Sequence, residues 1–124
     1  TFLDVKQELR KVKETLEKDL KQGHLGTVQI GAANNSVTFR IPIAVANQGD
    51  ITWGPWITYS LNAGQLLRND GANIKVVANN INAIVFNLGA TNPKIMNVDI
   101  TVNKISLRRE LITSTMQLDI ALRN

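Results

Sequence analysis

The hydrophobic periodicity of this chain changes once, at the glycine-bearing segment Gly23–Gly26. Before this segment, apolar residues recur every three or four positions, and after it they recur at every second position. The first spacing places side chains on one face of an α-helix, and the second places them on one face of a β-strand. The sequence therefore predicts a helix over residues 1–22 and a β-rich region over residues 27–124.

The predicted helix carries one narrow apolar stripe between solvated positions. Most of its other residues are Lys, Glu, Gln or Arg, which favour helix when they face water, and Gly23 is a natural stop signal. A helix of this length would form a rod of about 33 Å. Such a stripe requires either another helix or one face of a sheet. It consists of Phe2, Val5, Leu9, Val12 and Leu16, with Leu20 at its end.

Alternation of apolar and polar residues predicts about seven antiparallel strands, each with one buried face. Pro42 lies within the first of them, which indicates an edge strand or a bulge. We expect one α+β domain over residues 1–124, with a long N-terminal amphipathic helix packed on an antiparallel sheet. The expected strands include Val37–Val45, Trp56–Leu61, Gln65–Arg68, Ile74–Ala78, Ala83–Leu88, Val98–Val102 and Met116–Leu122. Turns are expected at Asn62–Gly64, Asn69–Gly71 and Thr91–Pro93.

The charge of +4 and the pI near 9.7 raise the question of nucleic-acid binding. Residues 1–22 hold six Lys or Arg and five Asp or Glu, and the remaining residues hold eight and five. Because the two signs are interspersed, no basic arm is formed, and no nucleic-acid partner is expected. Cysteine is absent, which excludes disulfides and thiolate chemistry. No run of about 18 apolar residues occurs, so the sequence shows no membrane span.

Residues suited to catalysis are sparse. His24 is the only histidine, and its place beside a helix end between glycines favours a capping or solvated role. No phosphate-binding loop, zinc-binding HExxH pattern or nucleophile elbow occurs. We predict a non-enzymatic protein without catalytic residues or bound cofactor. Enzymatic activity that depends on His24 is the alternative.

Calcium is the only metal that the oxygen-bearing residues suggest. Asp50 with Asn47, or Asp70 with Asn69 and Asn73, offers oxygen ligands. Neither group matches a calcium-binding loop, and turn formation explains these residues more simply. No metal site is therefore predicted.

Three aromatic residues, Trp53, Trp56 and Tyr59, cluster around Gly54 and Pro55. Aromatic residues of this kind can form a platform for a partner. They can equally close one end of the hydrophobic core. Both interpretations stay open at this level, and the three residues are a candidate partner platform.

The order of several short motifs resembles the soluble part of minor pilins and minor pseudopilins of the type IV pilin class. The nearest types are the J-type pseudopilin of type II secretion and the W-type minor pilin of type IV pili. The likeness extends over nearly the whole chain through short motifs that follow the charged helix. These motifs are Ser36–Phe39, Ile57–Arg68 with its glycine-bearing hairpin, Asn80–Phe86, and the ending Leu122–Asn124.

The resemblance implies a structural role without catalysis. Such a subunit would prime or cap a pilus or pseudopilus, and its partners would be other minor subunits and the major pilin. Residues 1–22 would be the soluble half of a longer helix. The hydrophobic half, preceded by a basic leader and methylated after cleavage, would come before Thr1. It would anchor the protein in the inner membrane, with the head in the periplasm or outside the cell, before incorporation into a fibre.

For the partner contacts, the resemblance points to the helix and to the exposed sheet face or edges. The helix interface is expected to include the stripe from Phe2 to Leu20 described above. The isolated domain is expected to be a monomer.

Two further alternatives come from local patterns. The helical stripe also fits the seam of a trimeric coiled coil, as in a fibre or adhesin with a β-rich head. The segment Thr38–Asn47 resembles the first long strand of late-embryogenesis β-sandwiches, which bind lipids or small ligands. A stable trimer would support the first alternative, and a deep apolar pocket would support the second.

Overall fold

The structure is a computed structural model that describes residues 2–45, 49–89, 94–105 and 108–123. Helix α1 (Phe2–Leu20) precedes the 3-10 helix η1 (Leu25–Thr27), and the strands follow. The strands are β1 (Gln29–Ile30), β2 (Ser36–Val45), β3 (Ile51–Asn62), β4 (Gln65–Asn69), β5 (Ile74–Ala78), β6 (Ile81–Leu88), β7 (Ile95–Ile105) and β8 (Leu111–Ala121).

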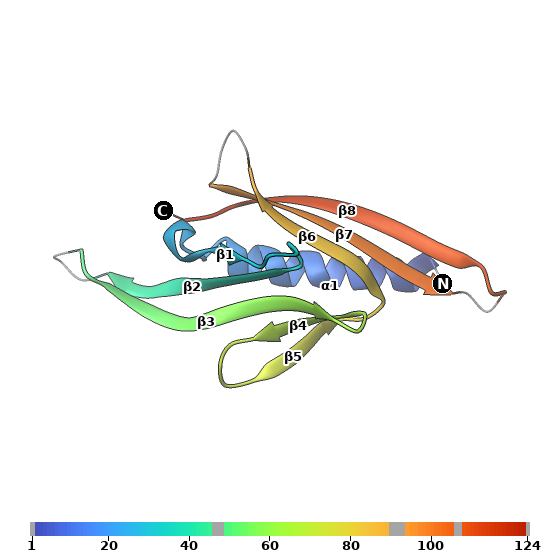
Figure 1. The fold of residues 1–124 in the computed structure, drawn as a ribbon, viewed down its shortest axis with the longest axis horizontal. Helices are drawn as coiled ribbons and strands as arrows, with labels where there is room; N and C mark the ends of the chain where they lie inside the picture. Colours follow the sequence, from blue (N-terminus) through green and yellow to red (C-terminus); the bar gives the residue numbers. More distant parts are fainter. Residues whose placement is uncertain (1, 46–48, 90–93, 106–107, 124) are drawn as a thin grey trace.

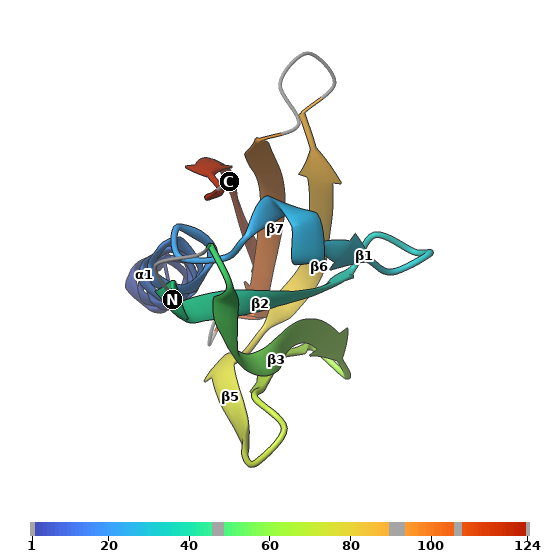
Figure 2. The same ribbon diagram turned by 90° about the vertical axis from the view of Figure 1, so that its left-hand side faces the viewer.

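The strands form two separate antiparallel sheets (Figure 1). The first has the order β1-β2-β3-β4-β5, and the second has the order β6-β7-β8. Each strand pairs with its sequence neighbour within its sheet, so both sheets are meanders. Figure 2 shows helix α1 to one side of both sheets.

The predicted fold class, α+β with a long N-terminal amphipathic helix packed on an antiparallel sheet, is wrong. The chain is mostly β, and its strands belong to two antiparallel sheets with one short N-terminal helix. Helix α1 has 19 residues and ends at Leu20, because Gln22 and Gly23 both donate backbone hydrogen bonds to Asp19 O. Gly23 is buried against the ring of Phe39, where the chain leaves the helix.

The division into two sheets arises at the junction between β5 and β6. Asn80 has a positive φ of 60°, a conformation that Asn tolerates better than most residues. Its carbonyl accepts a hydrogen bond from Asn103 N at 3.0 Å in the second sheet. The next residue, Ile81, donates to Gly64 O at 2.9 Å in the first sheet. The chain therefore passes from the first sheet to the second at this point. The alternation of apolar and polar residues could not predict this, because it shows which face of a strand is buried but not which strand lies beside it.

The shared core lies between helix α1 and the inward faces of both sheets. The described part of the helical stripe is buried, with no member more than 4% exposed. Helix α1 contacts β5 of the first sheet and β7 and β8 of the second. The core residues from the helix are Val5, Leu9, Val12, Leu16 and Leu20, and the larger ones from the strands include Phe39, Tyr59, Leu66, Ile84, Phe86, Met96, Ile100 and Ile120.

Several local predictions agree with the structure, and others fall outside it. The strand register between β2 and β3 shifts on both sides of Pro42, which confirms the predicted irregularity. The hairpin at Asn62–Gly64 is present, with Ala63 and Gly64 both at positive φ. Strand β1 was not predicted, because two residues carry no periodicity. The expected turn at Thr91–Pro93 lies outside the described residues.

Candidate functional site

A buried polar cluster joins helix α1 to the first sheet. Asp19 is only 7% exposed, although its neighbours in the core are apolar. The Tyr59 hydroxyl donates a hydrogen bond to Asp19 Oδ2, and Arg68 Nε donates to the same oxygen at 2.6 Å. Because Tyr59 and Arg68 face each other across β3 and β4, the sheet presents both donors to the helix at one point.

The electrostatics of this cluster favour an ion pair between Asp19 and Arg68 beside the neutral phenol of Tyr59. Burial, and then the hydrogen bond to Asp19, raise the pKa of Tyr59 well above its ordinary value near 10. The hydrogen bond to Asp19 also raises the pKa of Arg68. A buried carboxylate is retained only when it is paired and hydrogen-bonded. The cluster is therefore an anchor for the helix, and its chemistry does not resemble that of a proton-transfer site.

Sequence reasoning missed this anchor. Asp19 lies at the end of the helical stripe, beside Leu16 and Leu20, so its burial had a signal in the helical spacing. The helical spacing could indicate that Asp19 is buried, but no local sequence pattern predicts its contact with Arg68. Their proximity depends on the tertiary packing that brings Arg68 of β4 to the last turn of the helix.

The candidate platform divides between the two faces of β3. Tyr59 is fully buried and stacks on Phe39, with ring centroids 6.3 Å apart. Trp56 is 43% exposed on the outer face, and Trp53 is half-buried. Tyr59 therefore belongs to the core, and the role of Trp53 and Trp56 as a partner platform stays a prediction.

The two tryptophans surround an arginine. Arg40 on β2 pairs with Trp56 on β3, and the register then shifts so that Pro42 pairs with Trp53. The Arg40 guanidinium carbon lies 5.1 Å from the Trp56 ring centroid and 5.8 Å from that of Trp53. Arg40 Nε donates to Gly54 O at 3.0 Å. These contacts fix the guanidinium over two aromatic faces, an arrangement that Arg favours.

A glycine and a histidine complete this surface. A side chain at position 54 would bring Cβ to 3.0 Å from Ile41 O, so Gly54 permits the close approach of the two strands. The His24 ring meets Trp53 edge-to-face at 5.3 Å, and His24 Nδ1 accepts a hydrogen bond from Gly26 N. We call His24, Arg40, Trp53 and Trp56 the arginine–tryptophan surface. The capping role predicted for His24 is confirmed at η1.

The described residues of the predicted helix interface lie in the hydrophobic core of the protein. The described stripe from Val5 to Leu20 packs against the chain's own strands, and the side chain of Phe2 lies outside the described residues. A partner that approaches the helix from outside meets its charged face. The predicted role of the stripe in partner contacts stays a prediction, because a single chain does not test it.

The candidate calcium ligands at Asp70 form a turn. The Asp70 carboxylate accepts hydrogen bonds from Ala72 N and Asn73 N at 3.0 and 2.8 Å. The bonds from Asn73 and then Ala72 lower the pKa of Asp70. For the Asp50 group, Asn47 lies outside the described residues. The described part of the chain holds no group of three or more His, Asp or Glu side chains arranged for a metal.

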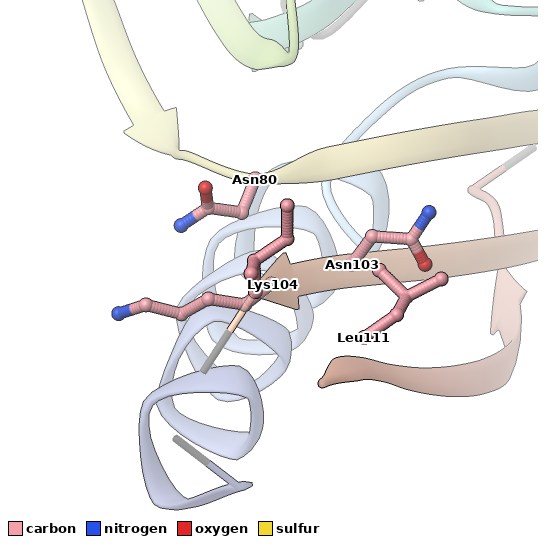
Figure 3. A pocket seen from close by; sticks show the side chains of 5 residues that line it. Asn80, Asn103, Lys104 and Leu111 are labelled. Atoms are coloured by element: carbon pink, nitrogen blue, oxygen red, sulfur yellow. The ribbon is translucent and has the colours of Figure 1, made fainter. Parts of the chain in front are cut away.

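The surface depressions in the described regions are shallow. One of about 470 Å³ lies where β6 begins, β7 ends and β8 begins (Figure 3). Two of its lining residues, Ile105 and Leu111, are 68% and 64% exposed, so it is open to solvent. Thr113 Oγ1 donates to Asn103 Oδ1 at 2.9 Å beside it. Its polar lining residues Asn80, Asn103 and Lys104 do not point toward one common position in Figure 3, whereas the polar groups of a ligand site converge.

Comparison with known proteins identifies no relative. No family model, no curated protein and no solved structure matches this chain. None of the helices in the described ranges is long and apolar enough to cross a membrane.

Proposed function

We propose that this chain is the head of a non-enzymatic fibre subunit, a minor pilin or minor pseudopilin of the type IV pilin class. It would prime or cap a pilus or secretion pseudopilus through contacts with other subunits. In this proposal it is held at the inner membrane by a segment that precedes Thr1, and its head lies in the periplasm or outside the cell. The motifs that follow the charged helix support the assignment.

The main structural support for the proposal is that helix α1 has two different faces. The inner face is held in the core by its apolar stripe and by the anchor at Asp19. The outer face exposes Arg10, Lys11 and Lys13, with acidic partners one turn away at Glu8 and Glu14. A helix fixed on one side and charged on the other suits lateral packing between subunits.

The same burial disfavours a trimeric coiled coil. The seam of such a coil would consist of the residues from Val5 to Leu16 that here are at most 4% exposed. Forming the seam would require the helix to leave its own core. A late-embryogenesis sandwich is disfavoured because the large depressions among the described residues are open and partly polar.

The direct test is the sequence of the natural gene upstream of Thr1. About 20 to 25 apolar residues with an early glutamate, behind a short basic leader, are expected. Mass spectrometry of the mature protein should then find a methylated N-terminal residue. A cleavable secretory signal or a start codon directly before Thr1 would exclude the pilin class.

A functional test uses the outer face of the helix in the natural host. Lys13→Glu reverses one exposed charge and leaves the buried stripe untouched. We expect normal accumulation of the subunit but reduced fibre assembly or secretion, whereas the matched control Lys13→Arg should behave as wild type. Unchanged assembly with Lys13→Glu and with a second reversal, Arg10→Glu, would argue against lateral packing through this face.

A further inference from the structure

We infer that the arginine–tryptophan surface binds a carboxylate of an acidic protein segment, with Arg40 as the recognition residue. This inference goes beyond the proposed function and does not rest on it. An acidic segment can be presented by any protein partner, whether or not that partner belongs to a fibre.

The guanidinium of Arg40 is preorganised. Its Nε is used by Gly54 O, and its plane is held by the two indole rings. The described residues provide no acceptor for its two terminal nitrogens. A fixed guanidinium with two terminal donors matches the two oxygens of a carboxylate. Little side-chain entropy remains to be lost on binding, which increases affinity.

The charge around Arg40 also favours an anion. None of the acidic side chains that the structure describes forms an ion pair with Arg40. The other arginine within a sheet, Arg68, is already neutralised by Asp19 and lies 3.7 Å from Asp70. Arg40 is therefore a strand cation without a carboxylate partner in the described chain.

The apolar surroundings indicate a protein segment as the occupant. Trp56 is 43% exposed, and Ile43, whose side chain lies near Gly54, is 68% exposed. An Asp or Glu flanked by an apolar side chain would satisfy both the arginine and these surfaces. Tryptophan and arginine dominate the energetic centres of protein interfaces. Free phosphate would make no apolar contact with Trp56 and Ile43.

The chain contains its own reporter for this site. Trp53 and Trp56 are the two tryptophans of the sequence, so intrinsic tryptophan fluorescence reports on this surface alone. The probe is a short capped peptide in which Glu alternates with Leu, titrated into the chain of residues 1–124. The matched peptide replaces each Glu by Gln. Saturable changes in emission are expected, with an affinity about tenfold weaker for the Gln peptide.

Variants separate recognition by Arg40 from general electrostatic attraction. Arg40→Lys keeps the charge but removes the planar donor pair, so binding of the Glu peptide should weaken by about fivefold to tenfold. Arg108→Lys is the control, since this exposed arginine precedes β8 and lies outside the surface. It should leave binding unchanged. Far-ultraviolet circular dichroism of each variant verifies the fold.

Three results would overturn the inference. They are equal binding of the Glu and Gln peptides, no effect of Arg40→Lys, and tighter binding of inorganic phosphate or heparin than of the peptide. The last would assign the surface to a phosphate or a sulfated polysaccharide. The upstream gene sequence decides the proposed function separately, because peptide binding by the isolated chain does not depend on a leader or membrane anchor.

Discussion

The Tyr59 hydroxyl donates a hydrogen bond to Asp19 Oδ2, although the two residues are 40 positions apart in the sequence. Arg68 donates to the same carboxylate oxygen. One side chain of the helix is thereby bound by two neighbouring strands. This contact fixes the rotation and the height of the last helical turn, which apolar packing alone specifies less strictly.

Tyr59→Phe should destabilise the fold by about 1–3 kcal/mol, because the buried carboxylate loses one of its two donors. The ring and its stacking on Phe39 are retained, so the change removes only the hydroxyl. Urea unfolding followed by tryptophan fluorescence measures the free energy of unfolding. A loss below about 0.5 kcal/mol, the range of neutral surface changes, would show that Arg68 alone satisfies Asp19.

Alkaline pH should weaken the fold through the same tyrosine. The pKa of Tyr59 is raised in the folded state, so the unfolded chain releases the phenolic proton near pH 10 while the folded chain keeps it. The folded state then holds more protons, and stability falls as pH rises above about 10. Below the unfolded pKa this contribution is fully present.

The measurement compares the free energy of unfolding near pH 8 and near pH 11. Tyr59→Phe removes the only tyrosine and should flatten the profile over this range. In the wild type, phenolate absorbance should appear together with unfolding. Ionisation of Tyr59 near pH 10 in the folded chain would contradict its burial.

Leu16→Ala should destabilise the chain by about 2–5 kcal/mol, because Leu16 is fully buried between the helix and the strands. Leu111→Ala deletes the same atoms from a side chain that is 64% exposed and should stay within about 0.5 kcal/mol. Chemical unfolding of the two variants forms a matched pair. Similar stabilities would mean that the helix does not contribute its stripe to the core.

Gly23→Ala should also be costly, since the new Cβ would lie 2.9 Å from Phe39 Cδ2 and 3.3 Å from Leu20 O. Overpacking of this kind costs about 1–3 kcal/mol. Gly71→Ala provides a comparison, because Gly71 has a φ of +90° with no atom within 4 Å of the added Cβ. There the cost comes from backbone conformation alone. Thermal unfolding, together with Gly23→Ser as a second probe of the space, distinguishes the two causes.

Much of the secondary structure could be predicted from the sequence because it is local. The helical stripe and the alternating strands have one buried face each, and this pattern is visible without tertiary information. The division into two sheets could not be predicted. It depends on Asn80, whose positive φ turns the chain out of the first sheet, and a lone asparagine is equally consistent with an ordinary hairpin.

The candidate surfaces were only partly predictable for the same reason. The exposed and buried aromatic residues of β3 are neighbours in the sequence, but the bulge around Pro42 decides which face Trp53 and Trp56 occupy. Arg40 lies well before them in the sequence, on another strand, so its contact with both rings depends on the register between β2 and β3. Asp19 and Arg68 are likewise joined only by tertiary structure.

The joint after helix α1 has a mechanical consequence. The backbone N–H of His24 donates to Arg40 O on β2. On the other side of the joint, Leu25 N donates to Arg123 O and Arg123 N donates to Gly23 O. A force applied along the helix would therefore reach the first sheet through Arg40 and the second sheet through the residues that follow β8. Because these hydrogen bonds lie at one joint, we expect a pull on the helix to load both sheets together rather than one after the other.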